Sequence, residues 1–277
     1  VLNPIPCAWL VPDSDIKAVP YLPMAKDLVR YVGEAVAVVV AEDRYQAEDA
    51  AARVEVDYEP LPAAGDARAA LAADAPRAHL GSETNVAAEF TVDYGDADAV
   101  FAGAEHVVRE SILHHRGGGH AIEGRGALAC FDPVQDRMTL WTATQAPHQV
   151  KRNLVDLLGW DENAVRVIAP DVGGGFGPKA MFYPEEAVIP VAARLLGCPV
   201  KWVEDRREHF LCASHERDQY WEIEAAFDTD GKILAVRGTM IHDTGAFVPW
   251  GIVSPLISAA TVPGPYVVPA YRLTTTV

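Results

Sequence analysis

The sequence predicts a mixed α/β chain of the α+β class, built from two parts. Near the N-terminus an apolar run, a short helix and an alternating segment follow one another over residues 29–58. Beyond residue 89, short strands and helices succeed one another without an internal repeat. With 277 residues, 50% of them hydrophobic, the chain can form one large domain or two ordinary ones.

The first part is predicted to be a small βαβ unit. Residues 29–40 predict a strand, a tight turn and a second strand, and the second run is apolar throughout, which indicates burial on both faces. A helix is expected over residues 43–52, with Asp43 as its N-cap. Residues 54–58 alternate polar and apolar side chains, as in a half-buried strand.

The second part alternates short strands with two clear helices. Both helices begin at a proline and stop before a glycine, over residues 147–158 and 184–196. The Asp-Thr-Asp-Gly segment at 228–231 predicts a hairpin turn. Strands are expected over residues 90–92, 105–113, 127–131, 138–142, 165–169, 220–227 and 232–242, and a short helix over 96–103.

Composition narrows the classes of partner. The chain has 23 Lys and Arg against 39 Asp and Glu, a formal net charge of −16, and so nucleic acid is not expected as a partner. No apolar run reaches the roughly twenty residues of a membrane span, and no signal peptide is evident. The four cysteines form no C-x-x-C pair, which argues against an iron–sulfur or zinc site made by this chain alone and favours a reducing cytoplasm.

The candidate ligand cradle is the segment Asp171–Gly177 (DVGGGFG), which follows an expected strand. Glycine lacks Cβ, so main-chain N–H groups there can approach an anionic or strongly polar group directly. The segment fits neither a dinucleotide fingerprint nor a P-loop, because Pro178 follows it and Lys179 is followed by Ala180. A tight crossover between core elements is the alternative interpretation.

Two further segments are expected to converge on the same pocket. Gln145 lies between a strand end and a helix start, where its carboxamide either points into a cleft or is satisfied within its loop. His114, His115 and His120 stand among glycines and suggest a metal site, but adjacent histidines on a strand face opposite sides, which favours a polar loop. Charged pairs at 185–186 and 204–208 are assigned no catalytic role, and the latter is expected to be a solvated, self-paired turn.

Six segments, in this order, resemble the large subunit of the molybdenum hydroxylases, the family of xanthine dehydrogenase, aldehyde oxidase and aerobic carbon monoxide dehydrogenase. They are residues 30–39, 56–61, 123–127, 144–147, 171–177 and 200–208. The resemblance implies an α/β hammerhead domain over residues 1–75, a linker over 76–88, and the first part of a molybdopterin-binding α+β domain over 89–277.

The resemblance also implies roles for individual residues. In the family the molybdenum is held by the dithiolene sulfurs of a pterin, so no metal ligand is expected from the protein. Gln145 matches the glutamine that hydrogen-bonds an oxo ligand of the metal. Gly174, Gly175, Phe176 and Gly177 match the loop whose N–H groups approach the cofactor. The implied reaction is hydroxylation of a small N-heteroaromatic compound or an aldehyde with oxygen from water, and a close relative oxidises carbon monoxide.

Partners are implied in the same way. Electrons would leave through a 2Fe–2S subunit and an FAD subunit, and the pterin is expected in its cytosine dinucleotide form. The family's general-base glutamate has no match in this chain, so a C-terminal remainder of the large subunit is expected and the chain alone is expected to be inactive. Ala180 stands where xanthine-type enzymes carry a glutamate that contacts the purine, which argues against purine specificity.

Two other functions stay open at this stage. One is an incomplete scaffold or interaction subunit of the same fold that binds no cofactor. The other is an unrelated α/β enzyme with an anion-binding loop, which would need an acid–base pair near residues 173–177. Molybdenum and pterin analysis of the purified protein separates the scaffold from the hydroxylase.

Overall fold

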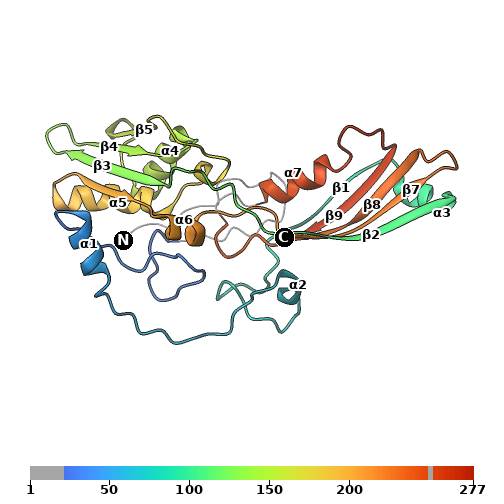
Figure 1. Ribbon diagram of the computed structural model, residues 1–277, viewed down its shortest axis with the longest axis horizontal. Coiled ribbons are helices and arrows are strands. Elements are labelled where there is room, and N and C mark those ends of the chain that lie inside the picture. The colour runs from blue at the N-terminus through green and yellow to red at the C-terminus, as the bar shows by residue number, and fades with distance from the viewer. Residues whose placement is uncertain (1–21, 249–251) are drawn as a thin grey trace. The chain divides into compact units, whose positions relative to one another are not determined.

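The structure, a computed structural model, describes residues 22–248 and 252–277, which form two compact units. The first unit comprises residues 22–61 and 118–215, and the second comprises residues 62–117, 216–248 and 252–277. Each unit therefore draws on separate stretches of the chain (Figure 1). The domain boundaries expected at residues 75 and 89 stay a prediction.

The first unit is built on a four-stranded sheet in the order β5-β4-β3-β6. The central β3 runs antiparallel to both β4 and β6, whereas β4 and β5 are parallel. The strands are β3 (Gly126–Asp132), β4 (Arg137–Thr142), β5 (Val165–Ile168) and β6 (Val200–Val203). The hairpin of β3 and β4 confirms the expected pair of strands, and β6 was not predicted.

Two helices pack on this sheet, α4 (Pro147–Leu158) against β5 and α5 (Pro184–Leu196) against β3, β4 and β6. Both carry the predicted proline at their start and end at a glycine in the left-handed region, with φ of 62° at Gly159 and 66° at Gly197. Leu154 of α4 and Leu140 of β4 are both fully buried. Three shorter elements complete this part: η1 (Glu162–Ala164), η2 (Pro178–Ala180) and α6 (Arg206–Cys212).

Residues 22–61 depart from the sequence prediction. The helix α1 (Arg44–Ala51) forms as expected, with the Asp43 side chain accepting a hydrogen bond from the Gln46 N–H. The strands expected at 29–40 and 54–58 are wrong for the described structure, which places no strand there. Val38 is 40% exposed, so the expected burial on both faces is wrong as well. A strand exists only when a neighbour completes its ladder, and these extended residues have no paired strand among the described residues.

The second unit is a five-stranded sheet in the order β1-β9-β8-β7-β2, in which β8 and β9 are parallel and the other pairs antiparallel. Its strands are β1 (Glu89–Tyr94), β2 (His106–His114), β7 (Gln219–Phe227), β8 (Ile233–His242) and β9 (Ala270–Thr276). Its helices are α2 (Ala67–Ala70), α3 (Ala97–Gly103), which contacts β8 and β9, and α7 (Val253–Thr261), which contacts β9. The hairpin of β7 and β8 confirms the prediction, and α7 and β9 were not predicted.

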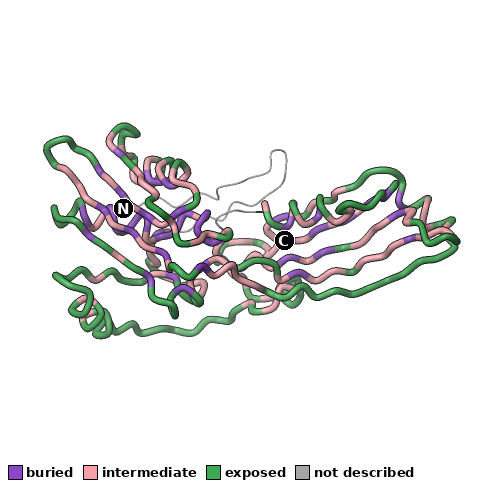
Figure 2. The backbone as a smooth tube through the Cα atoms, turned by 45° about the horizontal axis from the view of Figure 1, so that its top comes forward, coloured by how far each residue is buried: buried purple, intermediate pink, exposed green. Residues whose placement is uncertain are grey.

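The core of this unit gathers on the central strands. Tyr271, Leu273 and Met240 are almost fully buried with Ala259 of α7, and the Tyr271 hydroxyl donates to the Ala259 carbonyl at 2.6 Å. The edge strand β2 is exposed along its whole length (Figure 2). No helix in the described ranges is long and apolar enough to cross a bilayer.

Candidate functional site

The glycine loop, residues 171–177, leaves β5 and leads into η2. Its backbone turns through the left-handed region, with φ of 97° at Gly174, 54° at Phe176 and 100° at Gly177. An aromatic side chain in this region costs free energy that its surroundings must offset. Phe176 is nonetheless 73% exposed. A strained backbone that presents an exposed ring is typical of ligand sites rather than of a plain crossover.

Gln145 lies directly against this loop. Its side-chain Oε1 accepts a hydrogen bond from the Gly177 N–H at 3.0 Å, and its main-chain N–H donates to the Lys179 carbonyl at 2.9 Å. A Cβ added to Gly175 would lie 2.4 Å from the Gln145 Cδ and Oε1. Gly175 is therefore required by the close approach of the carboxamide.

A second glycine segment, residues 118–121, also packs against the loop. A Cβ on Gly119 would lie 2.6 Å from the Phe176 carbonyl oxygen, and one on Gly174 would lie 3.2 Å from the Ala121 Cβ. The structure thus brings Gln145 and residues 118–121 onto the loop, two of the segments that the sequence singles out. The roles of the site residues stay a prediction.

The loop offers unpaired main-chain donors. Within the described ranges, the N–H groups of Gly174, Gly175 and Phe176 have no hydrogen-bond acceptor, and neither does the Gln145 Nε2. Because the Gln145 Oε1 is occupied by Gly177, its amide group is left to donate outward. Several donors on a loop with glycines that admit close approach suit a ligand rich in acceptor oxygens and sulfurs.

A buried ion network around Arg125 and Glu204 lies in the same unit as the glycine loop, and it contradicts one prediction. Glu204 was expected in a solvated turn, yet it is 5% exposed. Its carboxylate accepts from the Arg125 main-chain N–H at 2.8 Å and from the Arg125 Nη2 at 2.6 Å, and it lies 2.7 Å from the His209 Nδ1. Asp205 and Glu208 form a capping box that begins α6, in which each carboxylate accepts a hydrogen bond from the other residue's main-chain N–H. The prediction failed because Arg125 is 79 residues away in sequence.

Arg125 links several elements of the first unit. Its guanidinium lies 3.9 Å from the Tyr183 ring centroid and 5.3 Å from that of Trp202, and its Nη1 is 3.1 Å from a Glu185 oxygen. Burial raises the pKa of the Glu204 carboxyl, but the charge and hydrogen bonds of Arg125 outweigh burial and leave that pKa below its usual range. The carboxylate is therefore ionised at neutral pH, and the network fixes the chain just after Glu123.

The histidines give no metal centre. His120 and His209 lie 5.0 Å apart between ring centroids, and the His120 Nδ1 and the His209 Nε2 are buried with no hydrogen-bond partner among the described residues. Burial, followed by the nearby His209, lowers the pKa of His120 and keeps its ring neutral. Among the described residues no three His, Cys, Asp or Glu side chains are grouped so that they could hold a metal ion. His114 ends the exposed strand β2 of the second unit.

Three functional candidates were missed by sequence reasoning. They are Glu123, Lys179 and Glu204. Glu123 belongs to one of the segments that resemble the family, and Lys179 was considered only as a P-loop lysine. No local pattern pairs the two, because 56 residues separate them.

Two family descriptions match the chain. The family description "Molybdopterin cofactor-binding domain" matches residues 78–277, and "Aldehyde oxidase and xanthine dehydrogenase, a/b hammerhead domain" matches residues 12–62. The chain therefore belongs to the molybdopterin cofactor-binding domain family of the molybdenum hydroxylases.

Individual relatives fall in the same family. The chain is 45% identical over 226 residues to the nicotine 6-hydroxylase large subunit of Paenarthrobacter nicotinovorans, covering 81% of this chain and 27% of the relative. It is 38% identical to the carbon monoxide dehydrogenase large chain of Hydrogenophaga pseudoflava, over 89% of this chain and 32% of the relative. Among solved structures, quinoline 2-oxidoreductase from Pseudomonas putida 86 superposes with a TM-score of 0.90 and 38% identity, over 95% of this chain and 34% of that one. The chain thus spans about a third of the length of these relatives.

Proposed function

We propose that the chain binds a molybdenum–pterin cofactor on the glycine loop, as part of an oxidoreductase that hydroxylates a small N-heteroaromatic compound or an aldehyde with oxygen from water. The observation that carries the proposal is the contact between Gln145 and Gly175–Gly177, beside three N–H groups with no acceptor among the described residues. Family membership makes the molybdenum cofactor the ligand with the chemistry to use these donors.

The residues of the site hold and orient the cofactor. Gly174, Gly175 and Phe176 donate main-chain hydrogen bonds to it, and the Gln145 carboxamide donates through Nε2 while Gly177 fixes its Oε1. When bound, the cofactor supplies the two-electron redox chemistry that no side chain can supply. The Phe176 ring lies against Gly174, where an added Cβ would be 2.7 Å from its Cε2, and it is otherwise exposed beside the proposed binding loop.

The substrate class rests on the relatives. Nicotine 6-hydroxylase and quinoline 2-oxidoreductase are named for N-heteroaromatic substrates. Ala180, where xanthine-type enzymes carry a glutamate, supports a substrate other than a purine. These two points favour a small N-heteroaromatic compound over an aldehyde or carbon monoxide.

The remaining parts of the proposal concern the assembly. Relatives named as large subunits support partner subunits, which we propose carry the 2Fe–2S clusters and FAD, together with a C-terminal remainder of the large subunit. We further propose the cytosine dinucleotide form of the pterin, a cytoplasmic location and no turnover by the chain alone. A chain that spans about a third of its relatives supports the last point.

Cofactor analysis tests the proposal. The full chain, produced in cells that make the cofactor, is expected to carry molybdenum and pterin in equal amounts. Gly175→Ala is expected to lose at least about tenfold in cofactor content, because its Cβ would displace Gln145. Gly175 has no positive φ, so the new side chain acts through this contact and not through backbone strain.

The matched control is Gly65→Ala, where no atom lies within 4 Å of the added Cβ. It is expected to retain the cofactor. A well-folded wild-type chain without molybdenum or pterin would refute cofactor binding and favour the scaffold. Equal cofactor contents in Gly175→Ala and the wild type would refute the assignment of the site to Gln145 and the loop.

A further inference from the structure

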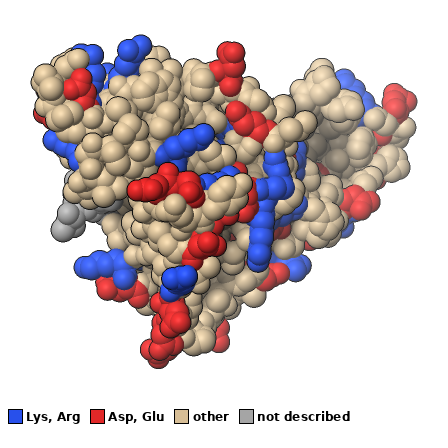
Figure 3. Space-filling view, turned by 60° about the vertical axis from the view of Figure 1, so that its left-hand side comes forward, with Lys and Arg blue, Asp and Glu red and all other residues tan. Residues whose placement is uncertain are grey.

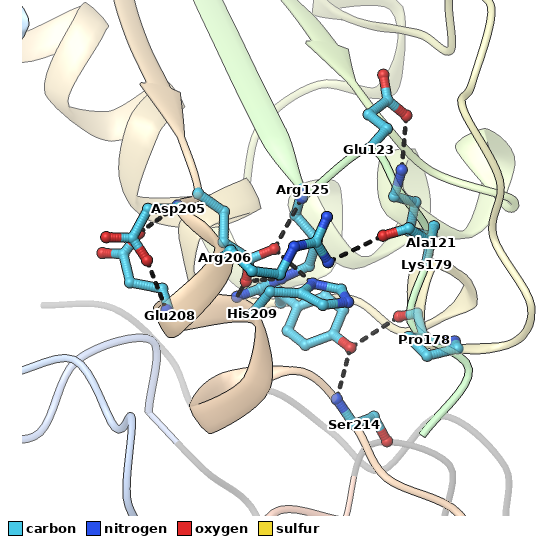
Figure 4. A network of polar contacts seen from close by, with 12 residues as sticks. Ala121, Glu123, Arg125, Pro178, Lys179, Asp205, Arg206, Glu208, His209 and Ser214 are labelled. Carbon is cyan, nitrogen blue, oxygen red and sulfur yellow. Dashed lines mark hydrogen bonds and ion pairs between the residues drawn. The ribbon is translucent and has the colours of Figure 1, made fainter. Parts of the chain in front are cut away.

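We propose that Glu123 and Lys179 form a clasp that holds the glycine loop and Gln145 in the conformation that receives the ligand. The clasp is the ion pair between these two side chains (Figure 4), together with the hydrogen bond from the Gly173 N–H to Glu123. Its effect on the cofactor rests on the proposed function, whereas its effect on the loop does not.

The ion pair is set in an unusual place. The Lys179 side chain is 1% exposed, and its Nζ lies 2.6 Å from the Glu123 Oε2, whose side chain is 42% exposed. Among the described residues Glu123 is the one acidic group within ion-pair distance of this ammonium. A buried ammonium without a partner is costly, so Lys179 stays in place only while Glu123 is there.

The same carboxylate oxygen also binds the start of the loop. The Glu123 Oε2 accepts from the Gly173 N–H at 2.7 Å, and a Cβ on Gly173 would lie only 2.6 Å from the Glu123 Cβ. Glu123 therefore joins Gly173 to Lys179, and these two residues flank the ligand-facing part of the loop. One side chain thus ties together the chain on either side of residues 174–177.

The clasp extends to Gln145 through the main chain of Lys179. The Lys179 carbonyl accepts from the Gln145 N–H at 2.9 Å and from the Thr144 hydroxyl at 3.2 Å. A shift of Lys179 would therefore move the carboxamide and the loop together. This coupling distinguishes the clasp from an ordinary surface ion pair.

The charges within the clasp fit this role. Burial raises the pKa of Glu123, but the hydrogen bond from Lys179 and that from the Gly173 N–H outweigh it and lower the pKa overall. The carboxylate is ionised at neutral pH and neutralises the ammonium. Lys179 is thus committed to Glu123 and does not contact the ligand, whereas the neighbouring loop N–H groups stay free to do so.

A double-mutant series with hydrogen exchange tests the clasp in the full chain. Glu123→Ala and Lys179→Met are each expected to speed exchange of the Gly177 amide, which donates to the Gln145 Oε1, by about tenfold or more, as for the loss of a charge-assisted hydrogen bond. The double variant E123A/K179M removes both charges and so leaves no unpaired ammonium. Its free energy of unfolding is expected to match that of the wild type. Its Gly177 amide is still expected to exchange fast, and its cofactor content is expected to be lower than that of the wild type.

This combination of wild-type stability and fast loop exchange distinguishes the clasp from a merely stabilising ion pair. If the pair only stabilised the fold, the double variant would recover both the wild-type stability and the wild-type rate of loop exchange. The matched control is E162A/K151M, which removes the Glu162–Lys151 pair of the same unit, at 3.7 Å with Glu162 76% exposed. It is expected to change neither quantity. Wild-type rates of loop exchange in E123A/K179M would overturn the clasp.

The two proposals can fail separately. Loop exchange is measured without cofactor, so a wild-type chain that binds no molybdenum or pterin would sink the proposed function and still leave the clasp to be judged by exchange. A wild-type chain with normal cofactor content and a loop indifferent to E123A/K179M would sink the clasp alone.

Discussion

Replacing Glu204 with Gln is expected to destabilise the first unit by about 3 kcal/mol. The Glu204 side chain is fully buried and that of Arg125 is 6% exposed. Neutralising the carboxylate leaves the guanidinium with Glu185, 3.1 Å away and 22% exposed. Removal of one partner from a buried ion pair costs about 3–5 kcal/mol, and the surviving Glu185 contact places this variant at the lower end.

Hydrogen exchange of the β3 and β6 amides at increasing urea reports the opening of this sheet. With a urea dependence of about 2–3 kcal/mol per molar, the opening midpoint should fall by about 1–1.5 M. The control is Glu162→Gln, whose carboxylate is 76% exposed, and it should stay within about 0.5 kcal/mol of the wild type. A loss in Glu204→Gln no larger than in this control would refute the reasoning that the buried pair is coupled to the fold.

Two further predictions concern the second unit. Gly95→Ala should destabilise it by at least about 1 kcal/mol more than Gly81→Ala. Both glycines have positive φ, but only a Cβ on Gly95 would meet a backbone oxygen, that of Pro269 at 2.7 Å. Melting temperatures of the two variants give the comparison. Burial, opposed by Asp243 and Asp218, lowers the pKa of His242 to about 4. The unfolded chain, with a histidine pKa near about 6.5, therefore binds more protons between these values, and stability should rise with pH across that window. His242→Asn should flatten this rise in melts at pH 4.5 and 7, and an unchanged slope would count against a neutral buried His242.

Local signals explain which elements the sequence predicts. The helices α4 and α5 follow from a proline at the start and a glycine at the end, and the β7–β8 hairpin follows from its Asp-Gly turn. The strands expected over 29–40 and 54–58 failed for the opposite reason. Their apolar residues show a preference for extended backbone, but a ladder needs a partner strand, and sequence pattern alone does not name one.

The same contrast between local and long-range signals applies to the residues of the candidate site. The contact between the glycine loop and Gln145 could be anticipated from sequence because each belongs to a short segment with its own motif, whereas their role in binding stays a prediction. The clasp and the Arg125–Glu204 network could not, since their partners are 56 and 79 residues apart. A run of charged residues such as 204–208 predicts a solvated surface. Only the folded structure reveals that the Glu204 side chain is buried against the Arg125 guanidinium.

Two glycines of the loop are required by side-chain contacts and not by backbone conformation. Gly173 and Gly175 have no positive φ, so neither is needed for backbone conformation. Each instead makes room for one side chain, Glu123 at Gly173 and Gln145 at Gly175. A loop that is glycine-rich because side chains press on it is held in place, not loosened. The N–H groups of Gly174 and Gly175, which have no acceptor in the part of the chain that the structure describes, are therefore held in position. Under the proposed function this lowers the entropy that cofactor binding must overcome.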